Sequence, residues 1–444
     1  MSSTNSSAES YAIVTLGCPK NQVDSDKLEG TLATTGMVAA ADVETADVVV
    51  VNTCTFIEEA REESVETILT VAQRRRAGAR LVVTGCMAER YGDELTAELP
   101  EIDHLAPFGM SLAPAVAGAS GRDSEGRKVE PAAVPVVLGP TRGSPRRVPD
   151  FDLLNLPRPS SRRPWAYVKI AEGCDRACGF CAIPSFRGPQ RSRSIEQIMF
   201  EVEELAAREI VLVAQDLAAY GSDQGGGKRS IVELVRAVSA EVERVRLLYL
   251  YPSDLSDVLI DAICGTGVPY FDLSLQHVSP RLLRSMRRWG NGEKFLDRIE
   301  EIRNSEPRAA FRSNFIVGYP GETEADHDQL LEFIERARLD WCGFFAYSEE
   351  AGTHAATLDH KVAPELIADR LAELSEAQDT ITATKRDELI GSEVEVLVDE
   401  PGVGRSYREA PEIDGIISVP QTLGVGTIQT LTVSAAIGPD LEAL

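Results

Sequence analysis

The chain contains the segment Trp165-Ala-Tyr-Val-Lys-Ile-Ala-Glu-Gly-Cys-Asp-Arg-Ala-Cys-Gly-Phe-Cys181, in which an apolar run leads into three closely spaced cysteines. The apolar run is typical of a buried β-strand. Five more runs of this kind follow, and a helical pattern comes after each. Six βα units predict an open or partial (β/α) barrel over residues 165–390, with its chemistry on the loops at the C-terminal ends of the strands. The strand candidates are 165–171, 209–215, 245–251, 270–275, 311–317 and 341–347.

The three cysteines of this segment, Cys174, Cys178 and Cys181, are predicted to lie on the loop after the first barrel strand. Their spacing would also fit one face of a helix with buried structural thiols, but Gly173 and Gly179 favour a loop. A structural zinc site needs four ligands, and no fourth cysteine or histidine lies nearby in the sequence. Three cysteines suit a 4Fe–4S cluster with one iron that lacks a protein ligand and can bind a small molecule.

Residues 11–100 repeat one unit three times: an apolar run, a cysteine and a helical pattern. The runs end at Cys18, Cys54 and Cys86, and helices are expected near 23–34, 57–76 and 88–98. Short Val-rich runs that alternate with helices predict buried parallel strands in βαβ units. This part of the chain should therefore form a small, doubly wound α/β sheet.

Each of these three cysteines is expected at the end of a parallel strand, so that all three thiols lie along one edge of the sheet. The carboxyl edge is where open α/β sheets bind ligands. A second iron–sulfur cluster with three protein ligands, Cys18, Cys54 and Cys86, is the reading that we favour. Chance burial of three thiols, which proteins tolerate well, and redox exchange among them are the alternatives.

The overall composition describes an acidic globular protein. Asp plus Glu is 70 and Lys plus Arg is 45, so the net charge is −25, with 43% hydrophobic residues. Such acidity argues against a protein that coats nucleic acid non-specifically, and the apolar content excludes whole-chain disorder. Residues 1–10 lack the pattern of a signal peptide and predict a disordered tail. No stretch of about 20 residues is free of charge, so no membrane span is expected. Few, clustered cysteines suggest a cytoplasmic protein.

Two further segments differ from the α/β regions. Residues 117–164 are rich in Gly, Pro, Ser and Arg, which predicts a linker with one short strand at 134–138. Residues 391–444 alternate in short β runs and predict a small all-β barrel. That barrel has nine acids and two bases, Arg405 and Arg408, so its net charge is −7. The predicted parts are thus 1–10, 11–116, 117–164, 165–390 and 391–444.

The central motif C-x3-C-x2-C, with Phe180 before its last cysteine, resembles the signature of the radical S-adenosylmethionine superfamily. The resemblance implies that amino and carboxylate groups of S-adenosylmethionine chelate the open iron. It also implies that electron transfer cleaves the sulfonium to give a 5′-deoxyadenosyl radical. A low-potential electron donor is then required.

Two three-cysteine sets followed by a β-module resemble the methylthiotransferase family, from about residue 11 to residue 444. The family implies that the barrel cluster generates the radical, that the N-terminal cluster supplies or carries sulfur, and that a second S-adenosylmethionine gives the methyl group. Phe180, Gly318, Pro320, Gly321 and Glu322 are expected to contact S-adenosylmethionine, although 318–323 also fits a plain turn and helix cap. The matching pieces are Leu16-Gly-Cys-Pro-Lys-Asn21, Val51-Asn-Thr-Cys54, Thr84-Gly-Cys86, Ile183-Pro-Ser-Phe-Arg-Gly188, Leu275-Gln-His277, Gly318-Tyr-Pro-Gly-Glu-Thr323 and a TRAM-like tail.

Family branches modify either a tRNA adenosine or a side chain of a small-subunit ribosomal protein. A TRAM-like barrel that binds tRNA should be basic, whereas an acidic barrel favours binding of a basic ribosomal protein. The segments 214–221, 248–252 and 404–415 also resemble the ribosomal-protein branch, which methylthiolates the β-carbon of an aspartate in small-subunit protein number twelve. Ser274 and the segment 347–353 depart from the family pattern.

The sequence leaves other readings open. A tRNA methylthiotransferase is one, and a non-catalytic iron–sulfur sensor or electron carrier is another. We expect a monomer that acts on free or ribosome-bound protein and does not bind membranes. His277 fits a packed, hydrogen-bonded role at least as well as a catalytic one, and Cys264 and Cys342 are expected to be core thiols.

Overall fold

The computed structural model describes residues 8–112, 151–225 and 227–444. The predicted strand at 134–138 and most of the predicted tail and linker lie outside these ranges. The chain divides into two compact units, which we describe separately. None of the helices in the described ranges is long and apolar enough to cross a membrane. The first unit comprises Met1–Pro159, Glu172–Asp175 and Ala182–Arg191, and the second comprises Ser160–Ala171, Arg176–Cys181 and Ser192–Leu444.

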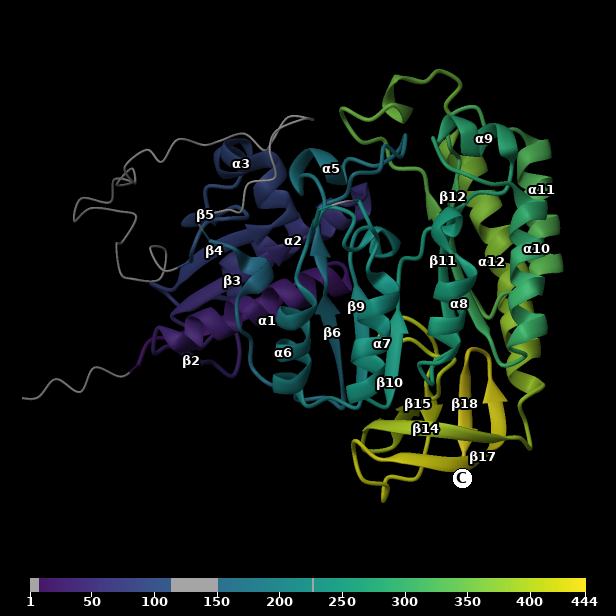
Figure 1. Cartoon of the computed structure of the whole chain (residues 1–444). Coiled ribbons are helices and arrows are strands. Elements are labelled where there is room, and N and C mark those ends of the chain that lie inside the picture. Colours follow the sequence, from purple (N-terminus) through teal and green to yellow (C-terminus); the bar gives the residue numbers. More distant parts are fainter. Residues whose placement is uncertain (1–7, 113–150, 226) are drawn as a thin grey trace, which may run out of the picture. The chain divides into compact units, whose positions relative to one another are not determined.

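The first unit is built on a parallel five-stranded sheet with strand order β2-β1-β3-β4-β5 (Figure 1). The valines of β3 alternate between its two faces. Val50 packs in the same core as Leu32 of α1, whereas Val51 packs with Ile68 of α2. Helices therefore cover both faces, which confirms the doubly wound sheet. The elements are β1 (Ser10–Thr15), α1 (Pro19–Thr34), β2 (Val38–Ala39), β3 (Val48–Thr53), α2 (Glu58–Arg74), β4 (Arg80–Gly85), α3 (Cys86–Glu98), β5 (His104–Ala106), η1 (Leu153–Asn155) and α5 (Ile183–Phe186).

Three predicted boundaries in this unit were wrong. Strand β1 begins at Ser10, whose hydroxyl donates to Asp47 at 2.6 Å, so Ser10 does not belong to the predicted tail. Helix α1 begins at Pro19 and not near residue 23, because proline is favoured in the first helical turn. Helix α3 begins at Cys86 itself. Helices α1 and α3 thus start closer to their cysteines than the sequence pattern indicates.

The second unit contains the predicted partial barrel. Strands β6, β9 and β10 form one parallel sheet and β11, β12 and β13 another, and a parallel bridge between Leu250 and Leu273 links them. The prediction of six parallel strands is confirmed. The elements are β6 (Trp165–Lys169), α6 (Ile195–Leu205), β9 (Glu209–Val213), η2 (Leu217–Ala219), α7 (Ile231–Glu241), β10 (Arg244–Leu247), η3 (Pro252–Asp254), α8 (Asp257–Cys264), β11 (Tyr270–Gln276), α9 (Pro280–Ser285), α10 (Gly292–Ser305), β12 (Ala310–Val317), α11 (Glu324–Ala337), β13 (Trp341–Ala346), η4 (Ala355–Thr357) and α12 (Pro364–Asp387). The short strands β7 (Ala171–Glu172) and β8 (Arg191–Ser192) each have one residue in either unit.

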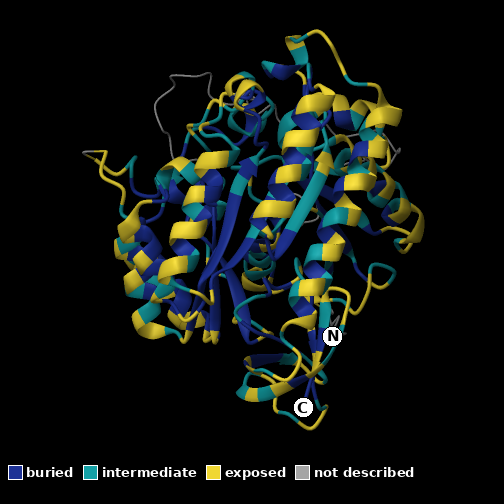
Figure 2. Ribbon diagram, turned by 90° about the vertical axis from the view of Figure 1, so that its right-hand side faces the viewer, coloured by how far each residue is buried: buried dark blue, intermediate teal, exposed yellow. Residues whose placement is uncertain are grey.

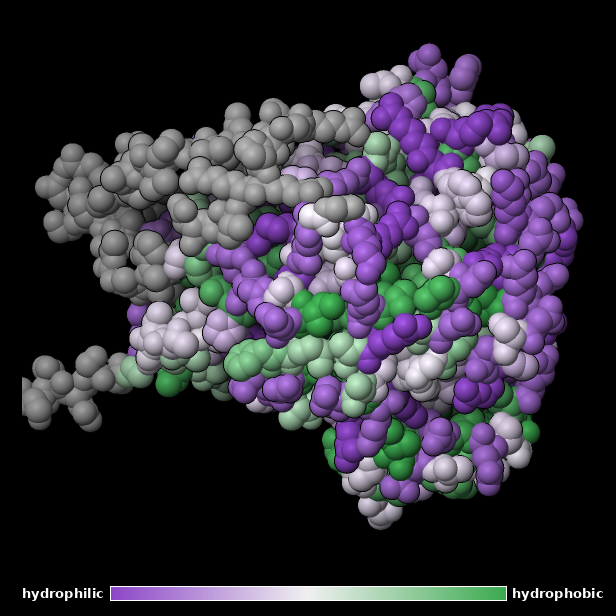
Figure 3. Space-filling model, in the orientation of Figure 1, coloured by the Kyte–Doolittle hydropathy of each residue, from purple (hydrophilic) through white to green (hydrophobic). Residues whose placement is uncertain are grey.

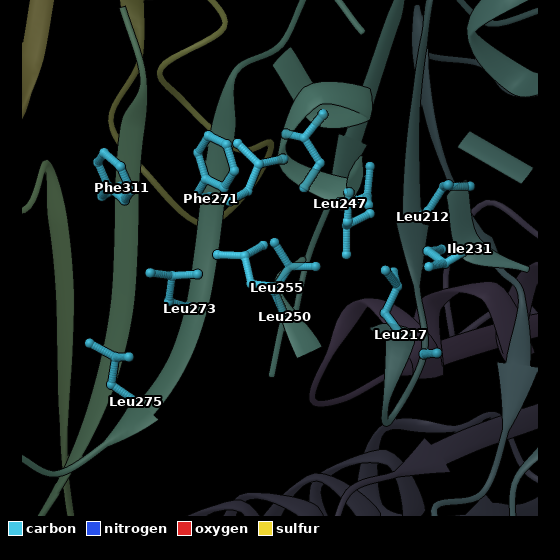
Figure 4. Packing of buried hydrophobic residues seen from close by; sticks show 14 of the residues in the cluster. Leu212, Leu217, Ile231, Leu247, Leu250, Leu255, Phe271, Leu273, Leu275 and Phe311 are labelled. Atoms are coloured by element: carbon cyan, nitrogen blue, oxygen red, sulfur yellow. The ribbon is translucent and has the colours of Figure 1, made fainter. Parts of the chain in front are cut away.

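The main core lies between these strands and their helices. Leu212, Leu247, Phe271 and Phe311 are fully buried in it, on successive strands (Figure 4). The helices show a buried stripe towards the strands and an exposed stripe on the opposite side (Figure 2). Hydrophilic side chains cover α10 and α11 in the space-filling view (Figure 3). The amphipathic pattern of these helices therefore explains which face they bury.

The C-terminal segment forms a closed barrel, as the sequence predicted, and the barrel has five strands. Strands β15 and β18 were not predicted, because runs of three and four residues give little periodic signal. The barrel elements are β14 (Glu393–Glu400), β15 (Val403–Arg405), β16 (Ile417–Ser418), β17 (Ile428–Ile437) and β18 (Asp440–Ala443).

Buried charges join this barrel to the amino-terminal ends of the partial-barrel strands. Glu209, at the start of β9, accepts hydrogen bonds from Arg246 at 2.7 Å and from Arg405 at 3.1 Å. Arg244 donates to the carbonyl groups of Glu395 and Arg405. Burial alone would raise the pKa of Glu209, but the three arginines hold it at about 2. One carboxylate therefore anchors the C-terminal barrel.

The substitution Glu209→Gln should destabilise the full chain by about 3–5 kcal/mol, because it leaves buried arginines without their counter-charge. The carboxylate, with a folded pKa of about 2, stabilises the fold above the pKa of unfolded glutamate, about 4.3. That contribution is lost as the pH falls towards 2, and so the variant should show a shallower acid dependence.

Denaturant unfolding at several pH values measures both effects. Glu243→Gln is the control, since Glu243 pairs with Arg208 at the surface and should lose only about 0–1 kcal/mol. Equal losses for the two variants would contradict this account of the anchor.

Candidate functional site

The N-terminal cysteines follow three neighbouring strands of one sheet. Cys18 follows β1, Cys54 follows β3 and Cys86 follows β4, and these strands are adjacent and parallel. The strand order reverses between β1 and β3, and such switch points at the carboxyl edge are where open α/β sheets bind ligands. The structure therefore brings together the three cysteines that the sequence assigned to one edge.

The three thiols lie close enough to influence one another. Burial, together with the neighbouring thiols of Cys86 and Cys18, raises the pKa of Cys54 to about 12. Within the described ranges, no three His, Cys, Asp or Glu side chains converge as ligands of a single metal ion. A cubane cluster differs, because each thiolate binds a separate iron at its own corner.

Glycines with positive φ precede two of these cysteines. Gly17 has φ +88°, and a Cβ there would lie 2.8 Å from the Sγ of Cys54. Gly85 has φ +91°, and a Cβ there would lie 2.5 Å from the carbonyl oxygen of Thr53. Both residues need a left-handed conformation and a close backbone approach, which only glycine allows at low cost. The glycines before Cys18 and Cys86 thus allow neighbouring loops to lie in close contact.

Buried amides tie the loops to each other. The side chain of Asn21 donates to the carbonyl groups of Leu16 at 2.9 Å and Thr53 at 3.0 Å. Asn52 in turn donates to the carbonyl of Asn21 and to the hydroxyl of Ser25, each at 2.9 Å. The loops after β1 and β3 are therefore fixed before any ligand binds, and a bound group would meet a preorganised site.

A buried arginine that sequence reasoning did not single out lies beside this site. The guanidinium of Arg187 donates to the Sγ of Cys86 at 3.0 Å and to Asn21 at 2.9 Å. Burial raises the pKa of Cys86, and Arg187 opposes that rise. Desolvation acts against ionisation of Cys18 as well, yet Lys20 and Arg187 help to bring its pKa below the ordinary value. A cation at this place suits thiolate ligands of an iron–sulfur cluster.

The central cysteines lie on tightly held backbone. The N–H of Cys174 donates to the carbonyl of Gly188 at 3.0 Å, within the first unit. Cys178 and Cys181 belong to the second unit. There the guanidinium of Arg288 donates to the Sγ of Cys178 at 3.4 Å. The predicted loop is present, since no regular helix contains the three cysteines.

The segment after β12 forms a turn and a helix cap. Glu322 accepts a hydrogen bond from the N–H of Gly318 at 2.7 Å and pairs with Arg370 at 2.9 Å. Thr323 caps α11 in a reciprocal box with Asp326. These internal contacts of Glu322 explain its conformation without a ligand. Contact of S-adenosylmethionine with Gly318, Pro320, Gly321 and Glu322 stays a prediction.

The remaining candidate residues have mostly packing roles. Phe180 packs against a small apolar cluster that includes Met286 and Tyr319. His277 is buried, its Nδ1 accepts from the N–H of Ser279, and burial lowers its pKa to about 4, so that it is neutral near pH 7. Cys264 and Cys342 pack against the main core.

Replacing Gly85 by alanine should disturb the N-terminal site more than backbone strain alone can explain. The added Cβ would collide with the backbone of Thr53, next to Cys54. Gly78 is a matched control, because its φ is +86° and nothing lies within 4 Å of an added Cβ. Gly78→Ala should cost about 1–2 kcal/mol.

Gly85→Ala should cost more than this control and should lower the iron bound after anaerobic reconstitution. Denaturant unfolding and iron analysis measure the two effects. Equal stability and equal iron in both variants would show that the approach of the loops does not matter.

Family models match three parts of the chain. Residues 10–107 match the uncharacterised protein family UPF0004, residues 168–334 match the radical SAM superfamily, and residues 390–444 match the TRAM domain. The matched ranges fall on the doubly wound sheet, the partial barrel and the closed barrel, respectively.

Curated relatives extend over the whole chain. The chain is 41% identical to the ribosomal protein uS12 methylthiotransferase RimO of Kineococcus radiotolerans, over 100% of this chain and 98% of that protein. It is 44% identical to the protein of the same name from Moorella thermoacetica, over 92% of each.

Among solved structures, the radical S-adenosylmethionine methyltransferase TsrM from Kitasatospora setae, with cobalamin and a [4Fe-4S] cluster bound, has a similar fold. Its TM-score is 0.53, with 15% identity over 95% of this chain and 84% of that one. At this identity the likeness concerns the fold alone. The full-length relatives and the three matched domains show that the chain belongs to the ribosomal protein uS12 methylthiotransferase RimO family.

Proposed function

We propose that this protein attaches a methylthio group to the β-carbon of an aspartate in ribosomal protein uS12, using S-adenosylmethionine and two 4Fe–4S clusters. The observation that carries the proposal is the placement of Cys18, Cys54 and Cys86 on adjacent loops at one sheet edge, in a chain that also has the central three-cysteine motif. The relatives named above, which are uS12 methylthiotransferases, support the substrate.

The six cysteines would hold the two clusters. Cys18, Cys54 and Cys86 would bind one, and Cys174, Cys178 and Cys181 the other. With S-adenosylmethionine bound, such a cluster supplies one-electron chemistry that can remove hydrogen from an unactivated carbon. Three thiolates per cluster leave one iron of each without a protein ligand, whereas electron carriers usually have every iron ligated by protein. This difference argues against a sensor or a carrier.

The chain's own cations support both sets of thiols. Arg187 donates to Cys86, and Arg288 donates to Cys178. Charge-assisted hydrogen bonds of this kind stabilise thiolates and offset the negative charge that they bring into a buried site. The neutral side chain of His277 is hydrogen-bonded internally, and we assign it no proton transfer.

The C-terminal barrel favours a basic protein as substrate. Five of its nine acids are exposed: Glu393, Glu395, Glu400, Glu412 and Glu442. Neither base is exposed, since Arg405 is buried against Glu209 and Arg408 lies 3.8 Å from Asp340. The barrel surface mixes hydrophilic and hydrophobic side chains (Figure 3). Such a face would repel RNA phosphates and attract a basic ribosomal protein.

The proposal also covers the domain boundaries, the oligomeric state and the cellular location of the protein. We assign residues 11–116 to the methylthiotransferase domain, 117–164 to a linker, 165–390 to the radical core and 391–444 to the TRAM-like barrel. A monomer in the cytoplasm that takes electrons from a low-potential donor, and acts on uS12 either free or within the ribosome, is consistent with this division.

Two cysteine substitutions separate the roles of the clusters. Cys54→Ala should lower the iron content from about eight to about four per chain, retain cleavage of S-adenosylmethionine and abolish methylthiolation. Cys178→Ala should abolish both reactions. Cys264→Ala is the control, because that thiol packs against the main core and belongs to neither set. Anaerobic iron analysis and quantification of 5′-deoxyadenosine check these outcomes. Normal methylthiolation by Cys54→Ala would refute the proposed second cluster.

Mass spectrometry of the product identifies the substrate. Incubation with uS12 should add the mass of CH2S to one aspartate-containing peptide, because a methylthio group replaces one hydrogen. Incubation with tRNA should leave its nucleosides unchanged. A methylthio group found on adenosine, with none on uS12, would favour the tRNA alternative.

A further inference from the structure

Arg187 occupies an unusual position within the first unit. Its side chain is only 3% exposed, and it follows the short helix α5. The guanidinium lies 3.9 Å from the centre of the Phe108 ring. A charged group with so little access to water requires nearby partners that compensate it, and the identity of those partners indicates what the residue does.

The two ends of the guanidinium have different partners. Nη1 donates to Asp24 at 3.1 Å and to Glu172 at 3.0 Å. Nη2 donates to Asn21 at 2.9 Å and to the Sγ of Cys86 at 3.0 Å. Two carboxylates already balance the single positive charge. The contact with sulfur is therefore not needed to compensate Arg187, and Nη2 acts there as a hydrogen-bond donor to the thiol.

The residue next to Arg187 holds the first cysteine of the central motif. The carbonyl of Gly188 accepts a hydrogen bond from the N–H of Cys174 at 3.0 Å. A Cβ on Gly173 would lie 2.3 Å from the carbonyl oxygen of Pro189, so the two backbone segments are in close contact. Residues 187 and 188 thus contact Cys86 through a side chain and Cys174 through the backbone, within the same compact unit.

We propose that Arg187 is a positioning residue that sets the reduction potential of the N-terminal cluster and holds Cys86 in place relative to the loop of Cys174. This inference rests on the proposed function, because it requires a cluster at Cys18, Cys54 and Cys86. A hydrogen bond from a cation to a ligand sulfur stabilises the more negative, reduced state of a cluster. Loss of Arg187 should therefore shift that potential to a more negative value.

Two substitutions separate charge from shape. Arg187→Gln removes the charge, and Arg187→Lys retains it. A lysine ammonium is a point charge and cannot span the carboxylates and the sulfur as the planar guanidinium does. The potential should be most negative for Arg187→Gln and intermediate for Arg187→Lys. Arg158→Gln is the matched control, because Arg158 is equally buried and pairs with Asp26 in the same unit.

The potential is measured by an EPR-monitored redox titration of full-length, anaerobically reconstituted protein that carries Cys178→Ala. On the proposed function, this background retains only the N-terminal cluster and binds about four irons. The expected result is a negative shift for both Arg187 variants and none for Arg158→Gln. If the background binds no iron, the proposed function fails. If it binds iron and the Arg187 variants keep the parent potential, the inference about Arg187 fails.

A second readout uses chains with both cysteine sets intact. Arg187→Gln should retain S-adenosylmethionine cleavage and lower methylthiolation of uS12 by about 10- to 100-fold, as changes to residues that support metal ligands typically do. A purely structural role would reduce both reactions together and would overturn the proposal. If Arg187→Gln does not fold, Arg187→Lys decides, since an unchanged potential and an unchanged ratio of the two products would also overturn it.

Discussion

The structure depends on one constraint, the parallel direction of the strands within each α/β sheet. Parallel strands bring their carboxyl ends to one edge, so that residues far apart in sequence meet there. Cys18, Cys54 and Cys86 are neighbours for this reason and through no local motif. The glycines that precede Cys18 and Cys86 then allow the loops to approach more closely than any side chain would permit.

The two ends of the partial-barrel strands have different roles, one structural and one at the proposed cluster site. At the amino-terminal end, Glu209 and its arginines are buried and hold the closed barrel in place. At the carboxyl end lies the loop with Cys178, whose thiol accepts from Arg288. This separation is common in βα barrels, where one face stabilises and the other carries chemistry. Arginines lie at both ends of the strands, and the one at the carboxyl end, Arg288, donates to sulfur.

The sequence predicted the elements that have strong periodicity and missed contacts that depend on the folded chain. The valine run of β3 and the six parallel strands of the partial barrel were predicted because buried parallel strands are rich in continuous apolar runs. Short strands such as β15 gave too little signal. The contacts of Arg187 were not predicted, because its partners Cys86 and Asp24 lie 101 and 163 residues away in the sequence. No local sequence pattern indicates contacts between residues that lie so far apart in the chain.

The acidic barrel shows how structure refines a charge count. The sequence gives a net charge of −7 for residues 391–444, which includes four acids that are not exposed. Among these, Asp399 pairs with Arg405, Glu409 with Arg386 and Asp414 with Arg312. Because both bases of the barrel are also withdrawn from the surface, only acids remain among its exposed charges. A partner would therefore meet a surface whose sign is uniform, which strengthens the argument for a basic protein beyond what the sum of charges conveys.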